Sequence, residues 1–223
     1  MESSNQTTVG YWPIRGLAGG VRLLLDYCGV PYTNKCYTDG NEWFEQDKPL
    51  HAVKNDFPNL PYLVDGDNII TESSAILHYI PIKAGKRELI GDTDEKFIKV
   101  QTAFFAVSDL WQAAVRPCWT KGDYETEKEA SFKSGDIKDK LTHFNSLLEN
   151  REFVTGFISI ADFKLFEAVE LLHDMDAAKL EAYPNVVAFY KRFLELPQVK
   201  AHRQSDKFIS LWFTKGMATW TNA

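Results

Sequence analysis

The sequence predicts an α+β protein in two parts, a mixed part of short strands and helices followed by a part built of helices alone. Up to about residue 80, short runs of β-forming residues alternate with segments of helical spacing. From about residue 93, apolar residues recur at steps of three and four, as on a helix that buries one face. With 223 residues, the chain can bury a sizeable core as one large domain or two small ones.

The first part opens with a strand, a helix and a second strand. Residues 7–12 and 31–38 have strand character, and residues 17–27 between them have helical spacing. Gly29 offers a helix end, because glycine readily adopts the left-handed conformation found there. We therefore expect a βαβ unit, whose crossover is almost always right-handed.

A hairpin and another helix complete this part. Residues 41–55 are ambiguous and are expected to hold a short helix. Apolar runs at 62–64 and 68–71 flank an Asp-Gly turn at 65–66, which is a strong hairpin signal. The helix that follows is expected to break at Pro81, since proline lacks a backbone donor. The resulting order, βαβαββα, is that of a thioredoxin-like domain.

Four helices are predicted in the second part, beginning near residues 93, 137, 160 and 184. Ser159 and Asp162 have the spacing of a capping box before the third of them. The aromatic tail, 208–220, is expected to pack back onto the body. The predicted domains are a thioredoxin-like domain at 1–85, a linker at 86–93 and an all-α helical bundle at 94–223.

Composition and charge argue against several classes of function. The net charge of −6 and the lack of a basic run argue against a nucleic-acid partner. The three cysteines form no C-x-x-C pair and the five histidines lack ligand spacing, so we expect no metal site, disulfide framework or dithiol redox centre. Each cysteine is expected to pack as a small hydrophobic residue. No long apolar stretch predicts a membrane span, and the polar residues 1–8 lack a signal-peptide core, so a cytoplasmic location is expected.

Three places are candidates for a ligand site. Tyr11 ends the first strand, where ligands of open α/β sheets bind. Leu60, before Pro61, can offer unpaired main-chain groups to an extended peptide. Glu72 and Ser73 open a helix, whose free amides attract anions. Taken singly, each has a more ordinary interpretation: a core aromatic, a turn before a strand, or a plain N-cap.

Taken together and in this order, these segments resemble the cytosolic glutathione transferases, and the mu class looks most similar. The resemblance is carried by the stretches 10–18 (GYWPIRGLA), 56–63 (DFPNLPYL) and 73–77 (SSAIL), and it extends from about Val9 to Trp220. It implies a homodimeric enzyme that uses reduced glutathione as co-substrate, without a further cofactor. Such an enzyme joins the glutathione thiolate to a hydrophobic electrophile in detoxification.

The resemblance also implies a role for each matching residue. Tyr11 matches the catalytic tyrosine, whose hydroxyl donates to the glutathione sulfur, and Arg15 is expected to support it or to form a buried ion pair. The matches to the glutathione site are Trp12, Trp43, Lys48, Asn59, Leu60, Pro61, Glu72, Ser73 and Asp109. The matches to the electrophile pocket are Leu17, Trp119, Phe213 and Thr214.

Within the glutathione site, the main chain of Leu60 is expected to pair with the cysteinyl unit, and Pro61 matches the family's cis-proline. Glu72 and Ser73 match the pair that holds the γ-glutamyl end. Asp109 matches an aspartate that reaches the same end across a dimer interface, although by itself it has the pattern of a solvated charge on a helix.

Three features depart from the mu-class pattern. Glu72 stands in place of a glutamine, and Trp119 in place of a tyrosine that can assist as an acid. The loop lengths before and after Trp43 also differ, so Lys54 competes with Lys48 as the residue that holds the glycyl carboxylate. Indole is no general acid at neutral pH, so the assistance of the tyrosine is expected to be lost.

Other functions remain open at this point. The same fold can serve as a carrier of hydrophobic ligands, or as a glutathione-dependent isomerase or peroxidase. A disulfide oxidoreductase ranks last, because Tyr11 and Trp12 stand where its cysteine pair is expected. The sequence names neither the electrophile nor the kind of dimer interface.

Overall fold

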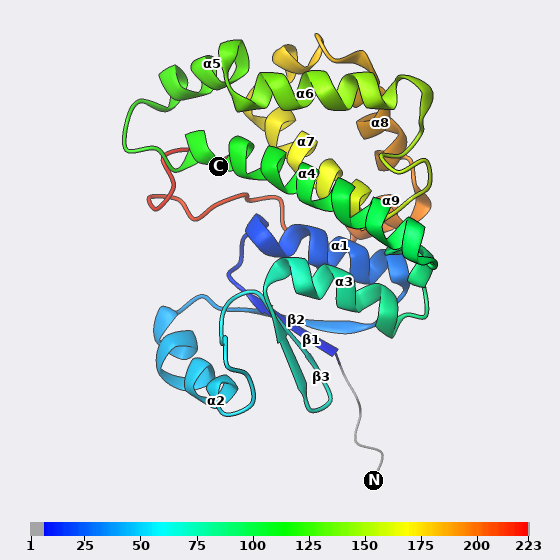
Figure 1. The fold of residues 1–223 in the computed structure, drawn as a ribbon. Coiled ribbons are helices and arrows are strands. Elements are labelled where there is room, and N and C mark those ends of the chain that lie inside the picture. Colours follow the sequence, from blue (N-terminus) through cyan, green and yellow to red (C-terminus); the bar gives the residue numbers. More distant parts are fainter. Residues whose placement is uncertain (1–6, 223) are drawn as a thin grey trace. The chain divides into compact units, whose positions relative to one another are not determined.

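The computed structural model describes residues 7–222, which fold into two compact units (Figure 1). The first unit comprises the described residues up to Lys86 together with Ala201–Ser210. The second comprises Arg87–Lys200 together with the described residues from Leu211 onward. Residues 201–210, which the sequence assigns to the helical domain, therefore cluster with the first unit. None of the helices in residues 7–222 has the length and apolar character needed to span a bilayer.

The first unit is built on a four-stranded mixed sheet, which confirms the predicted thioredoxin-like order. Its strands, in the spatial order β2-β1-β3-β4, are β1 (Thr7–Tyr11), β2 (Tyr32–Cys36), β3 (Tyr62–Asp65) and β4 (Asn68–Thr71). β1 pairs parallel to β2 along its whole length and antiparallel to β3 from Thr8 to Gly10, so this central strand ends at Tyr11 beside Cys36 of β2.

The helices of this unit follow the strands as predicted. They are η1 (Gly16–Ala18), α1 (Gly19–Cys28), the π-helix η2 (Glu42–Asp47), α2 (Lys48–Ala52) and α3 (Ser73–Lys83). α1 ends at Gly29, whose φ of 71° is left-handed, as expected of a glycine C-cap. α1 and α3 lie side by side over the sheet (Figure 1).

Two local predictions in this unit were wrong. α3 does not break at Pro81 but continues to Lys83, because Tyr79 and Lys83 both donate to the carboxylate of Asp65, at 2.6 and 2.7 Å, and hold the last turn. The hairpin turn lies one residue later than predicted. Asp65 pairs with Asn68 in the ladder, so Gly66, with its φ of 59°, and Asp67 form the loop.

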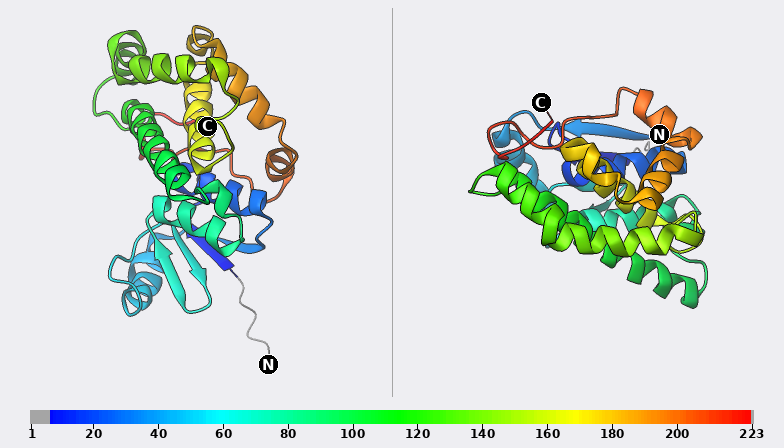
Figure 2. Two further views of the ribbon diagram at one scale, coloured as in Figure 1. Left: turned by 45° about the vertical axis from the view of Figure 1, so that its right-hand side comes forward. Right: turned by 90° about the horizontal axis from the view of Figure 1, so that it is seen from above.

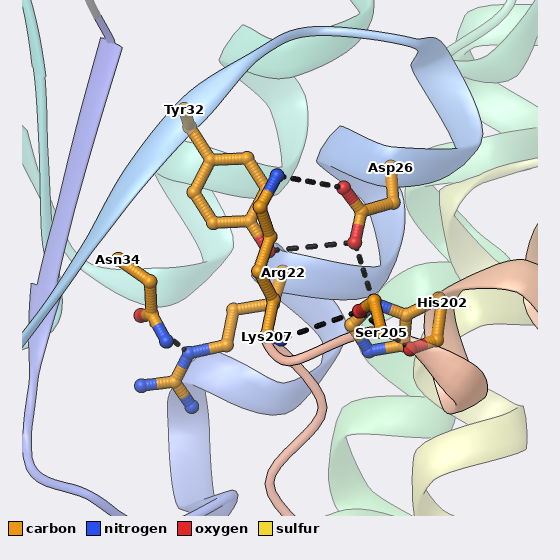
Figure 3. A network of polar contacts seen from close by, with 7 residues as sticks. All are labelled: Arg22, Asp26, Tyr32, Asn34, His202, Ser205 and Lys207. Atoms are coloured by element: carbon orange, nitrogen blue, oxygen red, sulfur yellow. Dashed lines mark hydrogen bonds and ion pairs between the residues drawn. The ribbon is translucent and has the colours of Figure 1, made fainter.

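The segment 201–210 is attached to the first unit by a buried polar network (Figure 3). His202, 5% exposed, lies with Nδ1 2.6 Å from Asp26 Oδ2 on α1. Tyr32 on β2 donates its hydroxyl to the same oxygen at 3.5 Å, and Lys207 Nζ lies 3.6 Å from the other one. Phe208 extends the attachment, because its ring lies 5.7 Å from the guanidinium of Arg15.

The second unit is helical, as predicted. Its elements are η3 (Arg87–Leu89), α4 (Asp94–Cys118), α5 (Tyr124–Ser134), α6 (Asp136–Leu147), η4 (Leu148–Asn150), α7 (Ile160–Leu180), α8 (Pro184–Leu194) and the start of α9 (Pro197–Gln204). The buried helix α7 contacts α4 and α8 at the centre of the unit (Figure 2).

The structure confirms the predicted start of α7 and shows two helices that the sequence did not predict. The carboxylate of Asp162 accepts the backbone N–H of Ser159 at 2.8 Å, as a capping box requires. α5 was missed because its only buried residues are Tyr124, Lys128 and Phe132, which give a weak apolar pattern. α9 was missed because its sequence is polar.

The aromatic tail packs onto the second unit as expected. Trp212 is fully buried and donates its indole N–H to Asp174 on α7 at 2.7 Å. Trp220 stacks on Tyr124 with ring centroids 5.7 Å apart. The backbone N–H of Thr219 donates to the carbonyl of Cys118 at 2.8 Å, so the tail is fixed at the end of α4.

Candidate functional site

Tyr11 ends the central strand with a buried hydroxyl that retains its proton. The residue is 7% exposed, and the backbone N–H of Leu17 donates to its oxygen at 3.4 Å. Burial raises the pKa of the hydroxyl, while the Leu17 amide and the charge of Arg22 lower it, and burial outweighs them. No acceptor for the Tyr11 hydrogen lies among residues 7–222. The hydroxyl can therefore donate to an added anion.

Arg22 shapes the loop that follows Tyr11, a role that the sequence did not predict. Its side chain is 1% exposed and donates to the carbonyls of Ile14 at 2.8 Å and Trp12 at 3.3 Å, and to the Asn34 side chain at 2.9 Å. In the sequence Arg22 stands within an apolar helical run, and only its placement on the buried face signals such a role.

Gly16 lets this loop pass close to the tyrosine. Its φ is +37°, which disfavours a side chain. A Cβ at this position would also come 2.9 Å from the Tyr11 hydroxyl oxygen. Because residue 16 is a glycine, no side chain at this position crowds the Tyr11 hydroxyl.

The segment before β3 differs from the prediction in one respect. The Leu60–Pro61 peptide bond is cis, and Leu60 is 9% exposed. We expected the main-chain groups of Leu60 to be unpaired, but the backbone N–H of Leu60 donates to the side-chain oxygen of Asn59 at 2.9 Å. This bond joins two adjacent residues, since an asparagine side-chain oxygen readily accepts from a neighbouring backbone amide. A peptide ligand would have to replace it or use the carbonyl of Leu60.

The start of α3 combines free helix amides with a strained residue. Glu72 precedes the helix with a φ of 64° and ψ of 111°, a rare conformation for a residue other than glycine. Its side chain is exposed, and Ser73 is the first helical residue. The first turn of α3 is therefore suited to an anion, beside a carboxylate suited to a cation.

Aromatic rings and a lysine lie on η2 and α2. Trp43 is 2% exposed and stacks on Tyr62 with centroids 5.8 Å apart. Trp12 is half-buried, and its ring centroid lies 6.1 Å from that of Phe44. Lys48 Nζ lies 5.9 Å from the centroid of the same Phe44 ring.

The two candidate lysines differ in their partners. Lys54 Nζ lies 2.9 Å from the Asp67 carboxylate, in an exposed ion pair. Lys48 forms no ion pair with any of the residues that the structure describes. An unpaired ammonium is free to meet an incoming carboxylate, so this difference favours Lys48 over Lys54.

The remaining predicted residues belong to the second unit. Trp119 follows α4 and is 44% exposed, and its ring meets that of Phe213 edge-on at 5.6 Å. Phe213 is buried, whereas Thr214 next to it is exposed. Asp109 is exposed on α4, and its carboxylate lies 3.4 Å from Lys140 Nζ.

Groups suited to metal or redox chemistry are scarce in the described part of the chain. No group of three or more His, Cys, Asp or Glu side chains is arranged to hold a metal ion in residues 7–222. Cys118 is buried, as predicted, and burial raises the pKa of its thiol to about 12. Cys28 and Cys36 are only half-buried, so their packing is looser than expected.

Comparison with known proteins identifies the family. The "Glutathione S-transferase, N-terminal domain" family matches residues 7–81, and the "Glutathione S-transferase, C-terminal domain" family matches residues 108–206. Human Glutathione S-transferase Mu 3 is 34% identical over 100% of this chain and 98% of its own length. Bovine Glutathione S-transferase Mu 1 is 33% identical over 96% of this chain and 98% of its own.

A solved structure agrees with these relatives. The Pi-class glutathione S-transferase of Onchocerca volvulus superposes with a TM-score of 0.72 and 28% sequence identity, over 88% of this chain and 91% of that one. The matching family domains, the full-length relatives and this structure all indicate the same family. The chain belongs to the glutathione S-transferase family, as a mu-like member.

Proposed function

We propose that this protein binds reduced glutathione, holds its sulfur as a thiolate and transfers that sulfur to a hydrophobic electrophile. The observation that carries this proposal is the buried Tyr11 hydroxyl, which accepts from Leu17 and has no acceptor for its own hydrogen in residues 7–222. Such a donor would stabilise a thiolate, because a hydrogen bond to the charged form of a thiol lowers the pKa of that thiol.

The required stabilisation is modest. A free thiol has a pKa of about 8.5, so only a few per cent of it is thiolate at neutral pH. Lowering that pKa by about two units takes roughly 2.7 kcal/mol of differential stabilisation. A charge-assisted hydrogen bond in a site that excludes water is of this size.

We assign the rest of the tripeptide to other residues of the first unit. Ser73 and the first amides of α3 would bind the γ-glutamyl carboxylate, and Glu72 its ammonium. Leu60 and Asn59, before Pro61, would meet the cysteinyl main chain. Trp43, Lys48 and the wall formed by Trp12 would hold the glycyl end. The residues assigned to the electrophile are Leu17, Trp119, Phe213 and Thr214.

A homodimer in the cytoplasm is part of the proposal. In it, Asp109 of the partner subunit would approach the γ-glutamyl end, and would have to leave the ion pair that it makes with Lys140. No metal or further cofactor is required by this chemistry. A carrier role is not favoured, because carrying a ligand does not need the Tyr11 hydroxyl, and the full-length relatives are named as transferases. A specialised isomerase or peroxidase is not favoured either.

The proposal is tested by conjugation of glutathione to an aryl halide, comparing the native protein with Tyr11→Phe. We expect native turnover and a fall in kcat of one or more orders of magnitude in the variant. Turnover that survives the substitution would move the sulfur's donor elsewhere, with Arg15 next to test. Native protein that binds glutathione without turnover would instead identify a carrier or a specialised isomerase.

A further inference from the structure

Tyr37, just after β2, contacts both the proposed catalytic residue and the segment that carries Trp43 and Lys48. It is fully buried. Its backbone N–H donates to the carbonyl of Tyr11 at 2.9 Å, and its hydroxyl donates to the Asp47 carboxylate at 2.5 Å. One residue therefore connects the end of the central strand with the end of η2.

Tyr62 on β3 supports this connection from the other side. Its hydroxyl lies 2.8 Å from that of Tyr37. Its ring lies so close to Gly10 that a Cβ there would come 2.1 Å from the ring carbon Cζ. Trp43 stacks on this ring, and His51 meets its edge with centroids 4.2 Å apart. Tyr62 thus touches both the strand residue before Tyr11 and the residues of η2 and α2.

Lys35 on β2 fixes both ends of η2. Its Nζ lies 3.0 Å from Glu42, the first residue of the π-helix, and 2.5 Å from Asp47, the last. Burial raises the pKa of Asp47, but the hydrogen bonds from Lys35 and Tyr37 together outweigh burial, so its pKa lies below the ordinary value. The carboxylate is therefore charged at neutral pH. The bond from the Tyr37 hydroxyl is then charge-assisted, which makes it one of the stronger kinds.

We propose that Tyr37 is a positioning residue for glutathione, which through Asp47 sets the distance between Tyr11 and the glycyl-binding residues Trp43 and Lys48. This inference rests on the proposed function. A tripeptide can place its thiol at Tyr11 and its glycyl carboxylate at Lys48 together only if that distance is fixed. Without the Tyr37 hydroxyl, part of the binding free energy at the glycyl end would be needed to order η2, so glutathione would bind more weakly.

The test is Tyr37→Phe, which removes one oxygen and keeps the ring. Each protein is assayed with glutathione and with γ-glutamylcysteine, a thiol that lacks the glycyl unit, against the same aryl halide. We expect KM for glutathione to rise about tenfold, which corresponds to about 1.4 kcal/mol. We expect KM for γ-glutamylcysteine and kcat at saturating thiol to stay within about twofold.

Tyr32→Phe is the matched control. It removes another buried tyrosine hydroxyl of the first unit that donates to a carboxylate, that of Asp26, and it should change neither KM. If Tyr37→Phe fails to fold, Asp47→Asn takes its place. That variant weakens the bond from Tyr37, because a neutral amide replaces its charged acceptor, and it also removes the charge that holds Lys35. We expect the same selective rise in KM for glutathione.

The outcomes separate this inference from the function on which it rests. An equal rise in KM for both thiols, or no rise for glutathione, would overturn the positioning role. Native protein that uses both thiols equally well would also overturn it, because no glycyl recognition would exist. Native protein that conjugates neither thiol would instead refute the proposed function.

Discussion

Arg22→Met tests whether a single buried guanidinium holds the loop after Tyr11. Methionine is similar in length and apolar, so the substitution preserves most of the packing and removes the donors. It leaves three acceptors without their partner, the carbonyls of Trp12 and Ile14 and the side-chain oxygen of Asn34. A buried acceptor left unpaired costs about 1–3 kcal/mol, so the sum is about 3–6 kcal/mol with partial relaxation. This is a large share of a typical folding free energy of about 5–15 kcal/mol.

The assay is urea-induced unfolding at one fixed protein concentration, followed by fluorescence, with aryl-halide conjugation measured on the folded fraction. Arg22→Lys serves as the comparison, because an ammonium keeps the charge but cannot donate in three directions as the guanidinium does. We expect it to lose about half as much stability as Arg22→Met, and both variants to lower kcat by loosening Tyr11. Arg22→Met within about 1 kcal/mol of the native protein would refute the reasoning.

Two further predictions concern the first unit. Burial raises the pKa of Asp65, but hydrogen bonds from Lys83 and Tyr79 outweigh it, so the folded-state pKa lies below the ordinary value of 3.8. The stabilisation by the Asp65 carboxylate is therefore complete at neutral pH and is lost as pH falls through the folded-state pKa. Asp65→Asn should cost about 1–3 kcal/mol of unfolding free energy at pH 7. The measurement is thermal unfolding at a series of pH values, and a cost that did not shrink below pH 4 would contradict this reasoning. Lys48→Met should raise KM for glutathione about tenfold, whereas Lys54→Met, which breaks an exposed pair worth at most about 1 kcal/mol, should leave KM unchanged. The reverse result in steady-state kinetics would assign the glycyl carboxylate to Lys54.

Local signals in the sequence were sufficient where a few adjacent residues decide the structure. Gly29 ends α1, and its N–H donates to the carbonyls of Leu25 and Asp26. Asp162 closes the capping box of α7. Each of these contacts spans four residues or fewer, so the pattern in the sequence contains both partners.

Local rules failed where a distant partner overrode them. Pro81 was expected to end α3, but Asp65 on β3 holds the turn beyond it. α5 buries three side chains along one face, and one of them is the charged Lys128, which pairs with the distant Asp176 on α7 at 3.7 Å as well as with Glu125 at 2.7 Å. A helix whose buried face includes a paired lysine has no clear apolar period to detect.

The sequence by itself determined the order of the elements in the first unit, the ends of helices that are fixed by adjacent residues, and the family, because these depend on short patterns and on a distinctive combination of segments. Only the tertiary structure showed how the site is held. Tyr37 reaches Asp47 across 10 residues and Tyr62 across 25, and Arg22 reaches the carbonyl of Trp12 across 10. Such contacts form only when the sheet brings separate segments together, and no local preference of the chain encodes them.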